Sequence, residues 1–210
     1  MSCNDSGQHF AHASTASEDL SADAAGMWVF VVGPSGAGKD TLMRLAQDKL
    51  RDCPRIVFAR RIVTRPHNAF EDHDTASEAA FITMQKANEM VLHWQAHGLF
   101  YGIQRRWQDA VNSGRIVVCN VSRTIIPEAV QRLNRVSVVL ITASPDVLAA
   151  RIAARGRDQA KGSRTSRDLD HSAQAHADII IDNAGTPDDG ADRLQQYLRK
   201  LNRLLPPKPR

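Results

Sequence analysis

The fold is decided by residues 27–40, which read MWVFVVGPSGAGKD. Six apolar residues come first, the pattern of a parallel strand buried on both faces. A GxxxxGK loop follows, and apolar residues then recur at helical spacing over residues 40–52. In this strand–loop–helix context, backbone N–H groups and the helix N-terminus converge on one anion. We therefore predict that a nucleoside triphosphate is bound by Gly33, Pro34, Ser35, Gly36, Ala37, Gly38 and Lys39, with Lys39 reaching the β- and γ-phosphates.

The residue after the loop lysine departs from the usual motif. A Ser or Thr normally stands there and gives a hydroxyl to Mg²⁺, whereas this chain has Asp40 followed by Thr41. A carboxylate at that position can ligate Mg²⁺ directly or through water, so we predict that Asp40 or Thr41 completes the metal shell. The alternative is that Asp40 is only a first-turn acid, stabilised by the helix dipole.

Working outward, strands and helices alternate along the chain. Strands are expected at residues 55–63, 90–94, 116–119, 136–142 and 178–181, a loop at 97–102, and helices at 77–89, 105–113, 127–134, 144–155 and 187–205. This order predicts an α/β fold with a mainly parallel sheet covered by helices on both faces. Residues 27–205 would form one domain with a mobile lid at about 156–170, and residues 1–26 and 206–210 would be tails.

Composition limits the classes of ligand. The chain has 210 residues and a formal net charge of +4, and most of its basic residues are arginines, which bind phosphates bidentately. Nucleic acid is the competing partner, but there is no Lys/Arg-rich run and aromatics make up only 5%. No apolar run has the roughly 18 residues of a membrane helix. The three cysteines are far apart, which favours free thiols in the cytoplasm.

The sequence shows no recognisable general base. This absence is understandable if the acceptor is itself a phosphate, because such a group is already largely ionised near neutral pH. The protein would then need only to position and neutralise two anionic reactants. The many arginines suit that task, although any single one could equally be a solvated surface residue.

The motifs resemble the guanylate kinase family, over about residues 27–205. The resemblance rests on the GPSGAGK loop, Thr64-Arg65-Pro66, the HGLFYG stretch at residues 97–102, the basic stretch after Arg151, and Ile181-Asp182-Asn183. Residues where guanine would be read depart from that family: His93 and Ser122 stand where it has acidic residues, and Ile103 where it has a hydroxyl. Phosphate handling is thus kept while base reading is lost.

This combination is similar to a narrower family, the ribose 1,5-bisphosphate phosphokinases of bacterial phosphonate degradation. Its marks here are Gly38-Lys39-Asp40-Thr41, Glu71-Asp72-His73, Trp94, Asn120 with Ser122-Arg123, and Ser144-Pro145. The resemblance implies transfer of the γ-phosphoryl group of ATP, with Mg²⁺, to ribose 1,5-bisphosphate, giving 5-phosphoribosyl 1-diphosphate. The substrate would thus be a small sugar phosphate, and we expect the protein to be a monomer or homodimer.

The resemblance assigns roles to further residues. Asn183 would lie beside adenine, and the lid arginines Arg155, Arg164 and Arg167 would act with Lys39 as catalytic residues by closing over the transferring phosphoryl group. The acceptor would be held by Arg61, Arg65, Tyr101, Ser122 and Arg123, with Glu71 and His73 lining its site. For His73, a capping or surface position is the alternative.

Two other functions remain open at this stage. One is a nucleoside-monophosphate kinase of relaxed specificity, against which His93 and Ser122 argue. The other is a non-catalytic nucleotide-binding or interaction module, against which Gly38, Lys39 and the lid arginines argue.

Overall fold

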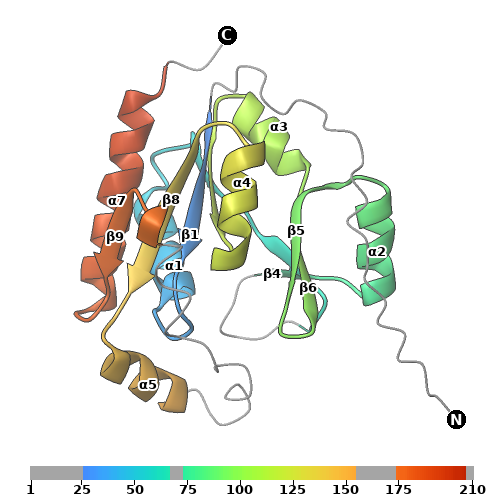
Figure 1. The fold of residues 1–210 in the computed structure, drawn as a ribbon. Coiled ribbons are helices and arrows are strands. Elements are labelled where there is room, and N and C mark those ends of the chain that lie inside the picture. The colour runs from blue at the N-terminus through green and yellow to red at the C-terminus, as the bar shows by residue number, and fades with distance from the viewer. Residues whose placement is uncertain (1–25, 67–72, 155–173, 207–210) are drawn as a thin grey trace, which may run out of the picture.

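A five-stranded parallel sheet forms the centre of the protein (Figure 1). The computed structural model describes residues 26–66, 73–154 and 174–206. Across the sheet the strands follow the order β2 (Ile56–Phe58), β7 (Ile116–Asn120), β1 (Met27–Val32), β8 (Val136–Thr142) and β9 (Ile179–Asp182). All four neighbouring pairs are parallel, so the predicted parallel sheet is confirmed.

Helices cover both faces of this sheet, as predicted. The first face carries α1 (Lys39–Lys49) and α7 (Pro187–Leu204), and the second carries α3 (Arg106–Asn112) and α4 (Ile126–Arg132) (Figure 1). Every residue of β1 is buried. Because side chains alternate along a strand, Val29 and Val31 pack in the first layer, while Trp28 and Phe30 pack in the second.

The first and last described helices are joined closely. Leu194 and Leu198 of α7 are fully buried in the same core as Leu42 of α1. At the rim, the Lys49 ammonium lies 2.6 Å from the Asp192 carboxylate. A Thr186–Asp189 capping box starts α7, which satisfies backbone N–H groups that a helix start otherwise leaves without partners.

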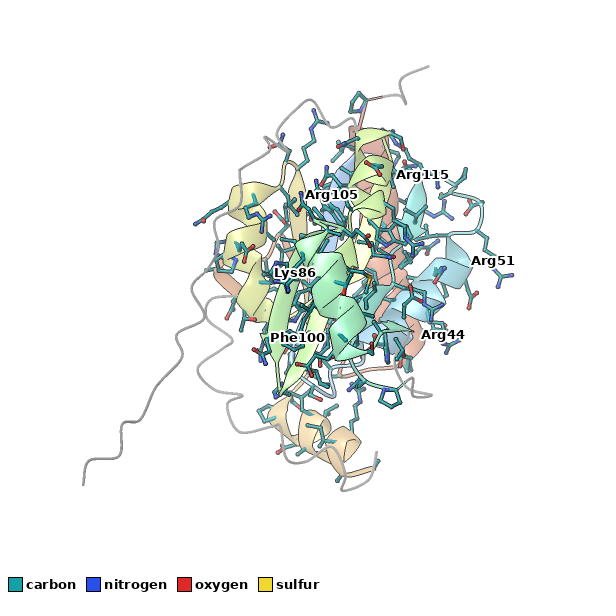
Figure 2. The ribbon with its side chains drawn as sticks, turned by 90° about the vertical axis from the view of Figure 1, so that its right-hand side faces the viewer. Arg44, Arg51, Lys86, Phe100, Arg105 and Arg115 are labelled. Atoms are coloured by element: carbon teal, nitrogen blue, oxygen red, sulfur yellow. The ribbon has the colours of Figure 1, made fainter. Side chains whose placement is uncertain are left out.

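A second, four-stranded sheet was not predicted. Its order is β4 (His73–Thr75), β3 (Arg61–Val63), β6 (Leu99–Gln104) and β5 (Met90–Ala96). The helix α2 (Glu78–Lys86), capped by the Ser77 side chain, packs on it. Figure 2 looks onto this side of the molecule, with Phe100 of β6 close to α2, where the Phe100 ring stacks on Phe81 at 5.6 Å between centroids.

The expectation of a loop at residues 97–102 was wrong. Residues 99–102 belong to β6, which pairs antiparallel with β5, and only His97 and Gly98 form the turn. Both have positive φ, 53° and 73°, as a two-residue hairpin turn of type I′ requires. The two glycines within HGLFYG, Gly98 and Gly102, suggested a loop. Gly102, however, lies inside the strand against Met90.

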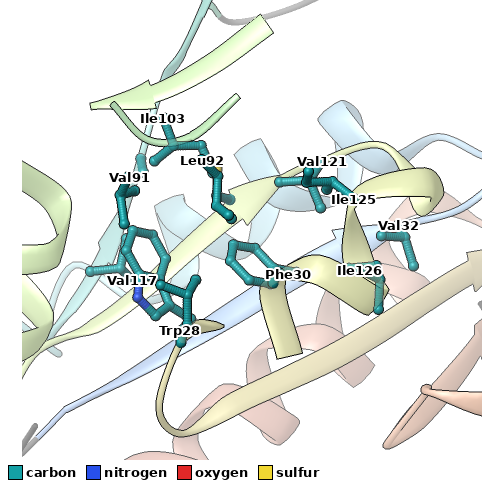
Figure 3. Packing of buried hydrophobic residues seen from close by; sticks show 14 of the residues in the cluster. Trp28, Phe30, Val32, Val91, Leu92, Ile103, Val117, Val121, Ile125 and Ile126 are labelled. Atoms are coloured by element: carbon teal, nitrogen blue, oxygen red, sulfur yellow. The ribbon is translucent and has the colours of Figure 1, made fainter. Parts of the chain in front are cut away.

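The strand expected at residues 55–63 divides between the two sheets. It separates into β2 and β3 at Ala59 and Arg60, so this segment carries the chain from one sheet to the other. A shared core then joins them: Val91 and Leu92 of β5 pack in one cluster with Trp28 and Phe30 of β1 (Figure 3). The two sheets are therefore packed on each other through a common core.

None of the helices in the described part of the chain has the length and apolar character needed to cross a membrane.

A core substitution on α7 tests the described packing. Leu194→Ala should lower the free energy of unfolding by about 2–5 kcal/mol, because it leaves a cavity between α7 and α1. Leu204→Ala on the same helix is the matched control, since Leu204 is 70% exposed, and should change stability by less than about 0.5 kcal/mol. Urea unfolding followed by circular dichroism measures both, and equal losses would contradict this packing.

Candidate functional site

The phosphate-binding loop lies where β1 ends and α1 begins. Lys39 is the first residue of α1, and its Nζ donates to the Gly33 and Pro34 carbonyl oxygens at 2.9 and 3.0 Å. Helix α5 (Pro145–Ala154) packs beside the loop, since Leu148 and Ile152 surround Gly36. In Figure 1, α5 and the turn between β5 and β6 lie at the same end of the molecule as this loop.

Two glycines of the loop are required by close contacts. Gly33 has φ 148°, and a Cβ added there would lie 2.0 Å from the Ile141 carbonyl oxygen of β8. Gly38 has φ 88°, and its Cβ would lie 2.5 Å from Nδ2 of Asn183. Both positions therefore exclude a side chain by backbone conformation and by space.

The side chain of Asn183 holds the loop through a hydrogen bond to its backbone. It follows β9, is only 2% exposed, and its Nδ2 donates to the Ala37 carbonyl oxygen at 2.8 Å. Its backbone carbonyl accepts from Arg151 of α5 at 2.9 Å. The predicted contact with adenine stays a prediction, while the contact with the loop is a role that sequence reasoning did not give it. The buried Oδ1 of Asn183 has no hydrogen-bond partner among the described residues.

Asp40 is held by the neighbouring strand. Its Oδ1 accepts a 2.8 Å hydrogen bond from Nδ2 of Asn120, the last residue of β7. The amide nitrogen must be the donor, because an ionised carboxylate can only accept. Thr41 is half-buried in the same helical turn. Sequence reasoning had noted Asn120 only as part of the family resemblance and gave it no role.

These groups fit a magnesium ion. Mg²⁺ is usually held by one or two carboxylates together with waters and substrate phosphates, and Asp40 supplies a carboxylate at the start of the phosphate-binding helix. Asn120 Oδ1 is buried and without a hydrogen-bond partner in the described ranges, so it can accept from a metal-bound water. Those ranges hold no cluster of three or more His, Cys, Asp or Glu side chains, so the remaining ligands would come from phosphate and water.

On the other side of Asn120, an arginine and two aromatic rings come together. The Arg61 guanidinium carbon lies 5.6 Å from the centroid of the Tyr101 ring, and Tyr101 stacks on Trp94 at 5.5 Å. Nη1 of Arg61 also donates to the Asn120 carbonyl oxygen at 3.5 Å. A guanidinium fixed over a ring can still bind phosphate through its edge. Two predicted acceptor residues, Arg61 and Tyr101, are thus brought together.

Three other residues predicted for the acceptor site, namely Arg65, Ser122 and His73, each have a different environment. Thr64 is bonded through backbone and side chain to Phe100 of β6, which fixes the segment leading to Arg65. Ser122 caps the short turn η1 (Arg123–Ile125), so its hydroxyl already accepts from the Thr124 N–H. His73 is 1% exposed at the start of β4, which excludes the surface alternative for this histidine.

Cys119 directly precedes Asn120 on β7 and is fully buried. Burial raises the pKa of its thiol to about 12, an effect that the Arg61 charge opposes and the Asp40 charge increases. The thiol is therefore neutral near pH 7 and is not a nucleophile.

Several predicted residues lie outside the described part of the chain. They are Glu71 and the lid arginines Arg155, Arg164 and Arg167, together with the predicted lid itself. The described part of α5 ends at Ala154, directly before the segment in which the lid was predicted.

The fold and the loop define the class, which is that of the P-loop kinases. A family profile described as an AAA domain matches residues 29–171. A solved guanylate kinase from Anaplasma phagocytophilum superposes with a TM-score of 0.64 at 19% identity, covering 83% of this chain and 85% of that one. This likeness confirms the guanylate kinase-like fold.

Sequence relatives narrow the class to one family. The chain is 50% identical over 174 residues to a ribose 1,5-bisphosphate phosphokinase of Methylobacterium radiotolerans, covering 83% of this chain and 98% of that protein. It is 48% identical to the enzyme of the same name from Rhodopseudomonas palustris, covering 83% and 89%. The protein belongs to the ribose 1,5-bisphosphate phosphokinase family, as the motifs had indicated.

The support that Asn183 gives to the loop can be tested. Asn183→Ala should weaken ATP binding by roughly fivefold, because the Ala37 carbonyl loses a hydrogen bond of about 1 kcal/mol. Gln131→Ala, a change at an exposed amide on α4, should leave the affinity unchanged. Isothermal titration with ATP measures both variants, and unchanged binding by Asn183→Ala would mean that the loop keeps its shape without this contact.

Proposed function

We propose that the protein transfers the γ-phosphoryl group of ATP to the 1-phosphate of ribose 1,5-bisphosphate, forming ADP and 5-phosphoribosyl 1-diphosphate. The observation that carries the proposal is the 50% identity to a ribose 1,5-bisphosphate phosphokinase over 98% of its length. The geometry around Asn120 supports it, because the reaction needs one site for each anionic reactant. Asn120 contacts Asp40, next to the phosphate-binding loop, through its side chain and Arg61, which lies over Tyr101, through its backbone carbonyl.

In this proposal the donor is held by the loop. The backbone N–H groups of residues 33–40 and the N-terminus of α1 face the phosphates, and Lys39 neutralises charge on the β- and γ-groups. Mg²⁺, held by Asp40 or Thr41, would supply further charge neutralisation between these groups. Asn183 contributes through the loop that it supports, and a contact with adenine is also part of the proposal.

The acceptor is activated by position alone. An oxygen of the 1-phosphate attacks the γ-phosphorus, the bond from that phosphorus to the bridging oxygen breaks, and ADP leaves with the electron pair. The attacking oxygen is already ionised, so no general base is needed. Arg61, Arg65 and Arg123 would hold the acceptor phosphates, and Tyr101, Ser122, Glu71 and His73 would surround the sugar.

The predicted lid would complete the site. Arg155, Arg164 and Arg167 would close over the transferring group and exclude water, which would otherwise hydrolyse ATP. Arg151 supports this proposal, because its bond to the Asn183 carbonyl fixes α5 against the same residue that supports the phosphate loop.

Phosphorylation of a nucleoside monophosphate is the second candidate. The guanylate kinase-like fold favours it, but His93 is exposed beside Gln85 and Ser122 is occupied in capping η1. Neither supplies the carboxylate that a guanine edge would need.

The cytoplasmic location, the use of Mg²⁺ and the monomeric or homodimeric state stay predictions.

One assay separates the candidates. Purified protein is given ATP and Mg²⁺ with either ribose 1,5-bisphosphate or GMP, and the products are resolved by phosphorus NMR. We expect the paired resonances of a sugar diphosphate in the first reaction and no GDP in the second. Robust GDP formation without a sugar diphosphate would refute the proposed acceptor, and no turnover with either would favour a binding module.

Lys39 should be essential for turnover. Lys39→Ala should lower kcat by at least about a hundredfold, because a charge-stabilising donor at the transferring group is lost. Lys200→Ala, an exposed lysine on α7, is the control and should match the wild type. Steady-state kinetics on both variants measure the effect, and full activity in Lys39→Ala would show that the loop does not act as proposed.

Arg61 should affect the acceptor more than the donor. Arg61→Ala should raise KM for ribose 1,5-bisphosphate by about 10- to 100-fold, the cost of one hydrogen-bonded charge contact, with little change in KM for ATP. Arg51→Ala is the control, since the Arg51 side chain is 81% exposed on another face. An equal rise in both KM values would mean that Arg61 acts through the fold.

A further inference from the structure

The hydrogen bond between Asp40 and Asn120 joins two elements at the metal position. Asp40 lies in the first turn of α1, and Asn120 ends β7, where it pairs in register with Val31 of β1. Asn120 is 6% exposed, so its amide cannot exchange freely between Asp40 and water. The 2.8 Å contact therefore fixes one oxygen of the carboxylate and leaves the other, Oδ2, for a ligand.

P-loop proteins usually divide the metal contacts differently. A neutral hydroxyl follows the loop lysine on the helix, and an aspartate follows a strand beside the loop strand. Here the helix carries the acid, Asp40, and the adjacent strand β7 ends in a neutral amide, Asn120. The pair still contains one carboxylate, but that carboxylate has moved from the strand to the helix.

The two ends of the Asn120 amide suit this arrangement. Nδ2 is engaged by Asp40, while Oδ1 is buried without a hydrogen-bond partner in the described part of the chain. A buried acceptor left in this way destabilises a fold, and a water in the first shell of a cation would satisfy it. The Asn120 backbone carbonyl meanwhile accepts from Arg61, so one residue contacts both the donor side and the acceptor side.

We propose that Asn120 is the positioning residue for a metal-binding Asp40, and that in this pair the carboxylate stands on the helix and the neutral group on the strand, the reverse of the usual arrangement. The inference rests on the proposed function for the presence of ATP and Mg²⁺, but it does not depend on the acceptor. The pair carries one carboxylate whichever of the two elements holds it. A carboxylate placed on β7 instead of α1 should therefore bind the same metal.

Three variants test this exchange. Asp40→Asn removes the carboxylate. Asn120→Leu keeps the carboxylate but removes its hydrogen-bond donor at nearly constant volume. The inverted pair, Asp40→Asn with Asn120→Asp, contains the same groups as the wild type with the carboxylate on β7. Gln131→Leu at an exposed position of α4 is the control for the amide-to-leucine change.

The measurement is Mn²⁺ binding to the protein–ATP complex, followed by electron paramagnetic resonance without acceptor. ATP affinity in EDTA and thermal unfolding are measured in parallel. Asp40→Asn and Asn120→Leu should each weaken Mn²⁺ binding by about 10- to 100-fold, as loss of a metal ligand or of its orienting partner does, with metal-free ATP affinity unchanged. The inverted pair should bind Mn²⁺ more tightly than Asp40→Asn, by about 10- to 100-fold, because a carboxylate and its orienting partner are both present.

Three results would overturn the inference. If Asn120→Leu stays folded and binds Mn²⁺ like the wild type, Asn120 does not position Asp40. If Asp40→Asn binds Mn²⁺ like the wild type, the pair only joins α1 to β7. If the inverted pair is as weak as Asp40→Asn while still folded, the two positions are not interchangeable. The inverted pair retains the hydrogen bond, so it decides the question even where Asn120→Leu lowers stability. Failure of the proposed acceptor is distinct, because it would abolish sugar diphosphate formation and leave Mn²⁺ binding intact.

Discussion

The structure depends on the burial of β1 between two parallel neighbours and two helical layers. Every side chain of this strand is buried, and its backbone is paired with β7 on one side and β8 on the other. Parallel strands end at the same edge of a sheet, so this pairing brings the loop after β1, Asn120 at the end of β7 and the end of β8 to one place. The site is assembled by the sheet, and its groups come from distant parts of the chain.

The second sheet adds what the parallel sheet lacks. Its strands β5 and β6 pack in the same core cluster as Trp28 and Phe30, which fixes the second sheet against the parallel sheet. The same sheet presents Arg61 and Tyr101 toward Asn120. A continuous core between the two sheets restricts the relative movement of the phosphate loop and Arg61, which benefits a reaction that relies on positioning two anions.

Much of this arrangement could be predicted from the sequence, for identifiable reasons. The apolar run before Gly33 and the helical spacing after Lys39 are local signals, and they gave β1, the loop and α1. Residues 99–102 were misread as a loop because glycines at both ends of HGLFYG masked a strand whose pairing with β5 is a tertiary contact. The Asp40–Asn120 contact spans 80 positions, and no local pattern indicates it. The family resemblance assigned Asn183 a contact with adenine. Its hydrogen bond to the Ala37 carbonyl, in contrast, is visible only in the fold.

The packing of α7 on α1 has a consequence for biosynthesis. A chain emerges from the ribosome in order, and domains form once their partners in space are available. Here the helix that follows the phosphate loop is covered by Leu194 and Leu198, and the loop itself is supported by Asn183. Both lie more than a hundred positions downstream of Lys39, so these contacts are of high sequence separation and slow to form. A chain truncated before Asn183 would therefore lack both the support of the loop and the cover of α1, and would expose the apolar face of that helix.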